Sequence, residues 1–200
     1  MNILGDLIKA LMWTKSFGIH VICILFIACA GVPKGIEPVD DFRPSAYLGQ
    51  WYEIYRYDHR FERGLSKVIA EYSIDTDNKG GADTAVGPDT RISVINKGFD
   101  PSTQKWQSAE GKAKFKASES IGHLLVSFFG PFYSSYVIFH TNWDDDKKRY
   151  DQAFATGPNR DYFWWLHRQA VPDQTDHENA RKVISENGFT WDNIIVVNQE

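Results

Sequence analysis

Short runs in which apolar and polar residues alternate follow one another along the chain after about residue 45. Clusters of Gly, Pro, Asn and Asp separate these runs, a pattern typical of antiparallel strands joined by hairpin turns. We predict strands at residues 50–57, 67–75, 91–97, 108–116, 123–129, 135–141, 149–156 and 161–168. Because no helix is expected between them and eight strands can close, the sequence predicts an all-β, up-and-down antiparallel barrel.

One helix is predicted after the last of these strands. It covers residues 173–187 and ends at Gly188, a residue type that commonly stops a helix. Its apolar residues form a narrow stripe, which consists of Ala180, Val183 and Ile184. The predicted fold is therefore a β-barrel with one C-terminal α-helix packed outside it, followed by a short strand at residues 194–197.

The chain begins with a segment that we interpret as a targeting signal. Residues 17–30 form a hydrophobic run that is shorter than the roughly 20 residues of a membrane-spanning helix. Residues 25–29 resemble a bacterial lipobox, in which the Cys is acylated and becomes the mature N-terminus. Ala30 follows this Cys where Asp would favour the inner membrane, so we expect a lipid anchor in the outer membrane, facing the periplasm.

These features divide the chain into three parts. We predict a signal peptide at residues 1–28, a lipidated N-terminus and linker at 29–44 with Cys29 as the acylated residue, and one domain at 45–200. Cys23 is the only other cysteine, so the mature chain would hold no disulfide. A cleaved secretory peptide and an uncleaved anchor remain alternatives.

Composition and charge narrow the choice of partners. A formal net charge of -4 over 200 residues gives no basic surface for a polyphosphate, so we expect no nucleic-acid partner. Aromatic residues make up 14% of the chain, which indicates a space lined or plugged with rings.

Three short motifs carry a resemblance to a known family. The segment Gly49–Ile54 reads GQWYEI at the start of the first predicted strand, Asp161 and Tyr162 precede the eighth strand, and Arg168 ends it. Motifs of this kind at this spacing resemble the three conserved regions of the lipocalins.

Longer stretches of sequence resemble one group within this family. They are YDHRFERGL from Tyr57, INKGF from Ile95, SFFGPFY from Ser127 and GPNRDY from Gly157. Together with the lipobox, they resemble the bacterial outer-membrane lipocalins, relatives of apolipoprotein D, from about residue 35 to residue 199. The resemblance implies a lipid-anchored carrier that stores or transports lipids for envelope maintenance under stress.

A closed barrel needs a plug at one end. The indole of Trp51 could fill that volume while the guanidinium of Arg168 lies across its face, a cation–π contact. We therefore predict that Trp51 and Arg168 form the floor of the barrel.

Strand alternation, with the lipocalin pattern as a guide to register, predicts which side chains line the interior. The expected ligand-binding wall consists of Val68, Ala70, Tyr72, Ile92, Val94, Ala113, Val126, Phe128, Tyr136, Ile138, Ala153 and Trp164. Small Ala side chains among aromatic ones favour an open cavity for an acyl chain, although a fully packed small barrel is the alternative. Phe163 and Trp165 should face outward, under the helix.

Polar groups near the mouth of the barrel would select a head group. We expect Arg56, Asp58, His59, Arg60 and Arg63 around the first loop, either as a site for a carboxylate or phosphate or as a solvated loop.

One further carboxylate has two possible placements. Parity places Glu53 on the side of Trp51, so it needs a buried partner unless a bulge turns it outward.

The sequence predicts a carrier rather than an enzyme. It contains no HExxH, CxxC or GxSxG motif, so we expect no metal, no cofactor and no catalytic residue. The expected ligands are fatty acids or lysophospholipids, the expected membrane contact is through Cys29, and a homodimer is possible. Alternatives are a carrier of pigments such as bilins, haem or retinoids, and an enzyme acting on lipids or isoprenoids, with Glu53 as its best catalytic candidate.

Overall fold

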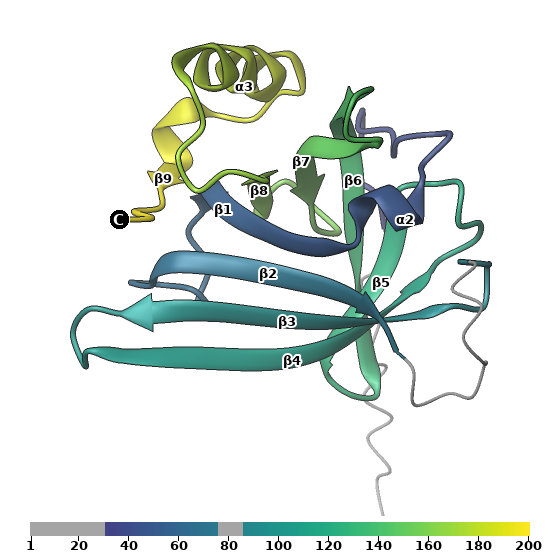
Figure 1. Cartoon of the computed structure of the whole chain (residues 1–200), viewed down its shortest axis with the longest axis horizontal. Helices are drawn as coiled ribbons and strands as arrows, with labels where there is room; N and C mark the ends of the chain where they lie inside the picture. The colour runs from purple at the N-terminus through teal and green to yellow at the C-terminus, as the bar shows by residue number, and fades with distance from the viewer. Residues whose placement is uncertain (1–30, 76–85) are drawn as a thin grey trace, which may run out of the picture.

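An antiparallel sheet forms the body of the molecule and closes on itself (Figure 1). The computed structural model describes residues 31–75 and 86–200. The strands are β1 (Gly49–Tyr57), β2 (Ser66–Ile74), β3 (Arg91–Asp100), β4 (Lys105–Phe115), β5 (His123–Phe129), β6 (Phe132–Asp144), β7 (Arg149–Thr156), β8 (Phe163–His167) and β9 (Ile194–Val196). Their order is β2-β3-β4-β5-β6-β7-β8-β1-β9, and a further pairing of β1 with β2 closes an eight-stranded barrel. The predicted fold class is confirmed.

The predicted C-terminal helix is present. The helical elements are α2 (Pro44–Tyr47), α3 (Gln174–Glu186) and the 3-10 turn η1 (Trp191–Asn193). The carboxylate of Asp173 caps α3 by accepting a hydrogen bond from the backbone N–H of Asp176 at 2.9 Å. After α3, Gly188 takes a φ of 70°, and the N–H of Phe189 then reaches the carbonyl of Ile184. The short helix α2 was not predicted, because four residues are too few to show a helical period.

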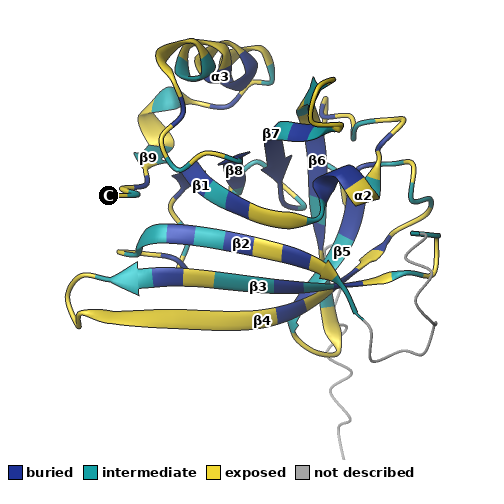
Figure 2. Ribbon diagram, viewed as in Figure 1, coloured by how far each residue is buried: buried dark blue, intermediate teal, exposed yellow. Residues whose placement is uncertain are grey.

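The strand bounds differ from the prediction mainly at the β3–β4 hairpin and in β6, which covers Phe132–Asp144 instead of the predicted 135–141. β3 and β4 continue to the pair Asp100 and Lys105, whereas the sequence pattern placed their ends at residues 97 and 108. The added residues of β4 are exposed, and this hairpin projects beyond the rest of the sheet (Figure 2). Its polar residues have no buried face, so hydrophobic alternation could not reveal them. In contrast, β8 is shorter than the predicted 161–168.

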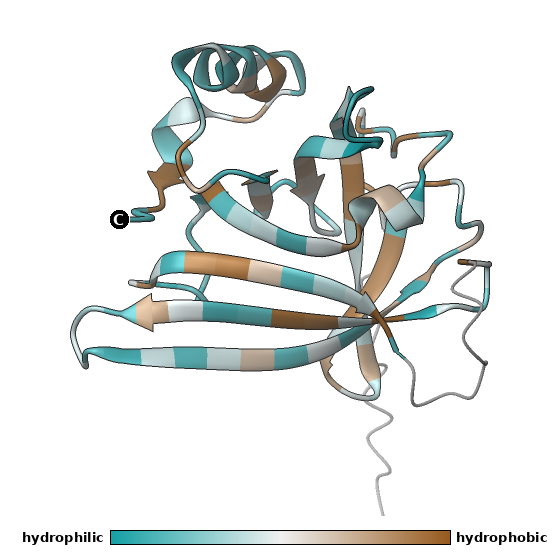
Figure 3. Ribbon diagram, viewed as in Figure 1, coloured by the Kyte–Doolittle hydropathy of each residue, from teal (hydrophilic) through white to brown (hydrophobic). Residues whose placement is uncertain are grey.

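Two groups of buried side chains lie on opposite faces of the closed sheet. The inner cluster consists of Phe42, Ala46, Tyr47, Trp51, Ala70, Tyr72, Ile92, Val94, Ala113, Phe115, Leu124, Ile138, Tyr150, Ala153 and Leu166. The outer cluster consists of Ile36, Ile54, Tyr55, Tyr57, Val137, Phe139, Phe154, Phe163, Trp165, Ala180, Val183, Ile184 and Phe189. Most residues of α3 are hydrophilic, and its buried apolar residues belong to the outer cluster (Figure 3). The helix therefore packs outside the barrel.

A bulge in β1 changes which side chains point inward. The pairing of β1 with β8 shifts between Glu53 and Tyr55, and both Ile54 and Tyr55 join the outer cluster. Beyond the bulge, inward positions have the opposite parity, so Arg56 follows Trp51 and Glu53 on the inner side of the strand.

Candidate ligand-binding site

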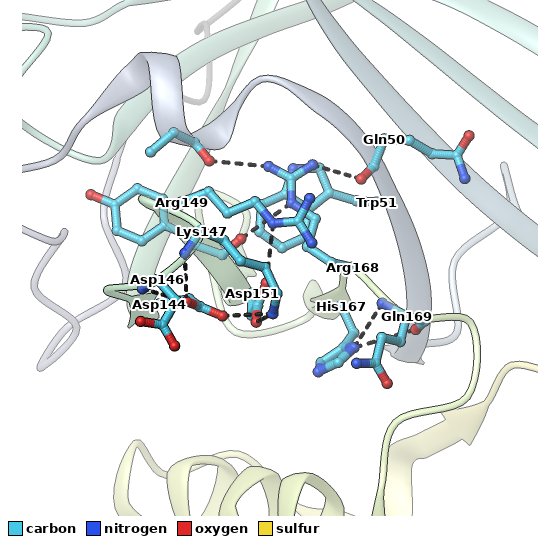
Figure 4. A network of polar contacts seen from close by, with 12 residues as sticks. Gln50, Trp51, Asp144, Asp146, Lys147, Arg149, Asp151, His167, Arg168 and Gln169 are labelled. Atoms are coloured by element: carbon cyan, nitrogen blue, oxygen red, sulfur yellow. Dashed lines mark hydrogen bonds and ion pairs between the residues drawn. The ribbon is translucent and has the colours of Figure 1, made fainter.

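One end of the barrel, which we call the closed end, is covered by the segment containing α2. The indole N–H of Trp51 donates to the carbonyl of Tyr47 at 2.8 Å, and Trp51 is fully buried. The guanidinium carbon of Arg168 lies 3.7 Å from the centre of the Trp51 ring (Figure 4). These two side chains thus occupy the place expected of a barrel floor.

Backbone carbonyls hold Arg168 in this position. Its guanidinium donates to the carbonyls of Gln50 at 2.6 Å, Leu48 at 2.9 Å and Tyr150 at 3.2 Å. It also donates to Ala46 and Tyr47, both at 3.1 Å. Burial lowers the pKa of Arg168 to about 10, which still leaves it charged at neutral pH. One side chain therefore ties the end of β8 to α2, β1 and β7.

Most of the predicted wall residues belong to the inner cluster or pack against it. Seven are buried members of it: Ala70, Tyr72, Ile92, Val94, Ala113, Ile138 and Ala153. Four are partly buried and packed against it: Val126, Phe128, Tyr136 and Trp164. Val68 is also buried but belongs to neither cluster. The structure thus brings eleven of the twelve residues together.

Three tyrosine hydroxyl groups meet within this apolar surround. The hydroxyl of Tyr72 donates to that of Tyr136 at 3.3 Å, and the hydroxyls of Tyr136 and Tyr47 are 3.0 Å apart. Burial raises the pKa of each tyrosine, to about 12 for Tyr72, so all three are neutral. Two hydrogen bonds use two of the three hydroxyl protons, and the third is available to another acceptor.

A buried ion pair lies farther along β1. The guanidinium of Arg56 donates to the Glu53 carboxylate at 2.9 Å and to the carbonyls of Glu62 at 2.8 Å and Leu65 at 3.3 Å. Burial and the Glu62 carboxylate raise the pKa of Glu53 well above its ordinary value. Glu53 is therefore inward-facing and paired, which decides between the two placements left open by the sequence.

Glu62 extends this polar group toward the first loop. Its carboxylate lies 2.8 Å from His59 Nε2 and accepts a hydrogen bond from the indole of Trp164 at 3.3 Å. Burial opposes ionisation, but the contact with His59 holds the pKa of Glu62 below its ordinary value. Charged side chains therefore lie beside the predicted wall residue Trp164.

Two inner polar atoms in this part of the barrel lack a protein partner. Among the residues that the structure describes, Arg56 Nε and Asn96 Oδ1 are buried and make no hydrogen bond. Asn96 lies two residues after Val94 on β3 and pairs across the sheet with Ala70, so it shares the inner face. One orphan atom is a donor and the other an acceptor, which suits a polar group of a ligand.

The opposite end of the barrel, which we call the mouth, is formed by the connections β1–β2, β3–β4, β5–β6 and β7–β8. A surface cavity of about 290 Å³ lies there, lined by Asp58, His59, Arg60, Phe61, Asp161 and Tyr162. The expectation for Arg56 was wrong, because the bulge buries it in β1 rather than leaving it around the loop. Asp58 and Arg63 form an exposed ion pair at 2.7 Å.

Sequence reasoning missed several residues that face this site. Asn96 continues the alternation of Ile92 and Val94, so strict parity could have identified it, whereas only apolar residues were selected. Tyr47 precedes the first strand, where no period gives its direction. Glu62 comes from the first loop, where only folding reveals its burial.

Some predictions fall outside the described residues. Cys29 and the signal peptide precede residue 31, and part of the loop between β2 and β3 is likewise not described. Within residues 31–75 and 86–200, no helix has the length and apolar character needed to cross a bilayer.

Comparison with known proteins identifies the family. A model of the lipocalin-like domain matches residues 44–199. The chain is 41% identical to the outer membrane lipoprotein Blc of Vibrio cholerae, covering 90% of this chain and 96% of that protein. It is 40% identical to Blc of Escherichia coli K12, covering 88% and 90% respectively. The cockroach allergen Per a 4 has the same fold, with a TM-score of 0.62 at 14% identity over 86% of this chain and 96% of that one.

The chain therefore belongs to the lipocalin family. Within that family it is a bacterial outer-membrane lipoprotein, lipid-anchored at the outer membrane. Membership of this family indicates a small-molecule binding protein rather than an enzyme.

Proposed function

We propose that the protein is a membrane-anchored carrier that binds fatty acids, lysophospholipids or related amphiphiles inside its barrel. It would store or transport these lipids for envelope maintenance under stress, with acylated Cys29 as its membrane anchor. The twelve wall residues predicted from the sequence, of which Val68 is the first and Trp164 the last, would form the binding wall. No catalytic group, metal or cofactor is part of this proposal.

The observation that carries the proposal is the combination of an apolar wall with orphan polar atoms inside the barrel. The side chains of Ala70, Ala113 and Ala153 occupy little volume on the inner face, and they lie among apolar and aromatic neighbours. Arg56 Nε and Asn96 Oδ1 add a buried donor and a buried acceptor without partners among the described residues. An amphiphile meets both conditions, because its chain buries apolar surface while its polar group satisfies these atoms.

Lipid identification and a filled-barrel variant test the proposal. Native mass spectrometry of the purified protein, followed by organic extraction, should release fatty acid or lysophospholipid. Ala113→Phe places a large ring on the inner face and should reduce oleate binding at least tenfold, measured by titration of tryptophan fluorescence. Ser108→Phe is the matched control, since Ser108 lies on the same strand, is exposed and has the opposite parity to Ala113, facing away from the interior. Circular dichroism checks that both variants fold.

The same experiments define what contradicts the proposal. A protein that releases no lipid and takes up neither oleate nor lysophospholipid would have a barrel filled by its own side chains. Equal oleate affinity in Ala113→Phe and Ser108→Phe would place the ligand elsewhere. A coloured protein with a visible absorbance band would indicate a pigment carrier instead.

A further inference from the structure

The first described residues of the chain are held at the mouth of the barrel. A Cβ atom built on Gly31 would lie 3.6 Å from the carbonyl oxygen of Pro158, in the connection between β7 and β8. Three residues later, Arg160 of the same connection donates to the carbonyl of Lys34 at 2.8 Å. Ile36 then enters the outer cluster and is buried. Residues 31–34 are therefore fixed at the mouth, and the chain reaches the closed end only near α2.

This placement limits where a lipid anchor can be. Cys29 precedes Gly31 by two residues, and two extended residues span at most about 7 Å. An acylated Cys29 would bring the bilayer surface to the end of the barrel that carries Pro158. The closed end, with Trp51 and Arg168, would then point away from that surface.

The mouth also carries exposed aromatic side chains, which we call the mouth patch: Phe61, Phe129 and Phe132. Their exposed fractions are 55%, 67% and 53%, although aromatic side chains usually bury most of their surface. The ring centres of Phe61 and Phe129 are 6.0 Å apart, and Phe129 pairs with Phe132 across the β5–β6 hairpin. The patch thus joins two connections that are distant in sequence. Contiguous exposed rings mark interaction surfaces, and aromatic side chains favour the interface between water and lipid.

A cation accompanies these rings. The guanidinium of Arg60 lies 4.7 Å from the centre of the Phe61 ring, and both residues line the cavity at the mouth. Arginine beside an aromatic ring suits a surface of anionic lipid phosphates, where each basic residue strengthens attachment. The nearby Arg63 is paired with Asp58. The mouth patch therefore offers an apolar contact, and the adjacent Arg60 offers a basic one.

We propose that the mouth patch docks on the bilayer that holds acylated Cys29, so that the barrel opens directly onto the lipid surface. A hydrophobic ligand would then pass between bilayer and barrel without crossing bulk water. The inference rests on the proposed lipid-anchored carrier for its anchor, whereas the mouth patch is an independent observation.

The test measures which end of the acylated full-length protein faces the membrane. A single labelling cysteine is placed at the mouth by Asn159→Cys or at the closed end by Asp146→Cys, both exposed positions. Each bimane-labelled protein is inserted in vesicles of phosphatidylethanolamine and phosphatidylglycerol that contain a nitroxide-headgroup lipid. Quenching should be strong for the mouth label and weak for the closed-end label. Equal quenching, or stronger quenching at residue 146, would overturn the proposal.

Paired variants assign the effect to the patch. The double variant Phe61→Ser, Phe129→Ser should show a smaller difference between the two labels, because removing two apolar rings weakens docking about tenfold or more while the acyl anchor still tethers the mouth end. Val171→Ser is the matched control, since Val171 is 65% exposed in the segment after β8, and it should keep the difference. A double variant in which the difference is undiminished would overturn the role of the patch. Near-ultraviolet circular dichroism verifies that the variants fold.

Other outcomes separate this inference from the carrier function. A mouth-facing orientation in a protein that binds no oleate would support docking and contradict the carrier. An intact mass without acyl chains on Cys29 would overturn docking by removing its anchor. A dimer that the double variant dissociates in sedimentation experiments, with unchanged quenching, would show that the patch binds a second copy instead.

Discussion

The outer and inner clusters use the two faces of one sheet in different ways. In the outer cluster, large rings fill the space under α3: Phe154 and Trp165 stack with centres 5.9 Å apart, and Phe163 and Phe189 are 4.9 Å apart. The inner cluster has Ala70, Ala113 and Ala153 between its rings. Rings also meet on the inner face near the closed end, where the ring of Tyr47 lies 5.0 Å from that of Trp51 and 5.1 Å from that of Tyr72. The two faces therefore differ in the small side chains of the inner wall rather than in the presence of aromatic packing.

Strand β8 shows the contrast in two adjacent residues. Trp165 is fully buried in the outer cluster and donates its indole N–H to Gln152 at 3.2 Å. Trp164 is only partly buried against the inner cluster and donates to Glu62. One indole thus completes a packed core and the other borders the candidate site. We therefore expect changes to Trp165 to act on stability and changes to Trp164 to act on ligand binding.

The largest expected effect comes from removing the outer indole. Trp165→Ala should lower the free energy of unfolding by about 3–5 kcal/mol, because the cavity it leaves cannot be refilled by its stacked neighbours. Trp164→Ala should cost less stability and weaken oleate binding more. Denaturant unfolding and fluorescence titration measure the two effects. Equal loss of stability in both variants would show that the faces are not specialised.

A pH effect of intermediate size tests a buried histidine beside the outer cluster. His123 pairs with Val137 across the sheet, its Nε2 lies 2.8 Å from Ser135 Oγ, and burial lowers its pKa to about 4. Between pH 6.5 and 4 the unfolded chain binds a proton that the folded chain does not, so stability should fall as pH falls through this window.

His123→Gln measures the share of this one residue. Between pH 7 and pH 4, the free energy of unfolding should fall by roughly 1–3 kcal/mol less in the variant than in the native protein. Denaturant unfolding at each pH measures this difference. Some pH dependence of stability should remain in the variant, because burial also lowers the pKa of His140 and His167. An unchanged pH dependence in the variant would show that His123 keeps its ordinary pKa.

The smallest expected change concerns the inner tyrosines. Tyr72→Phe removes the hydroxyl that donates to Tyr136 and should lower stability by only about 0.5–1.5 kcal/mol. The apolar wall stays intact, so oleate should still bind. Thermal unfolding and an oleate titration check this. A loss above the stated range would show that the three hydroxyls act as one cooperative network.

Much of the fold follows from local pattern, because one face of each strand is buried. Ala70 and Tyr72 are buried on either side of exposed Glu71, and this alternation allowed β2 and its inward side to be predicted. The stop at Gly188 likewise marked the end of α3, whereas Asp173, which the prediction placed in the helix, is its N-cap. Hydrophobic period and turn residues are local properties, so one sequence is enough to read them.

The polar part of the candidate site depends on contacts that no local pattern reveals. Ile54, Tyr55 and Tyr57 are all apolar enough to be buried, so the bulge that sends Arg56 inward has no signature in the sequence. Glu62 is buried only because the first loop folds back over β1. Local pattern therefore indicates which side chains face the interior, whereas the burial of Arg56 and Glu62 depends on the bulge and the loop.

The floor of the barrel bears on how the chain folds. Arg168 bonds to carbonyls that lie 118 to 122 residues earlier in the chain, at Gln50, Leu48, Tyr47 and Ala46. Contacts over such separations form only after a large loss of chain entropy, and sheets rich in them fold in milliseconds to seconds. We infer that the hairpins form early and that Arg168 locks the barrel late. Before those contacts form, the aromatic rings behind the floor lack their cover, and exposed rings of this kind favour association between partly folded chains.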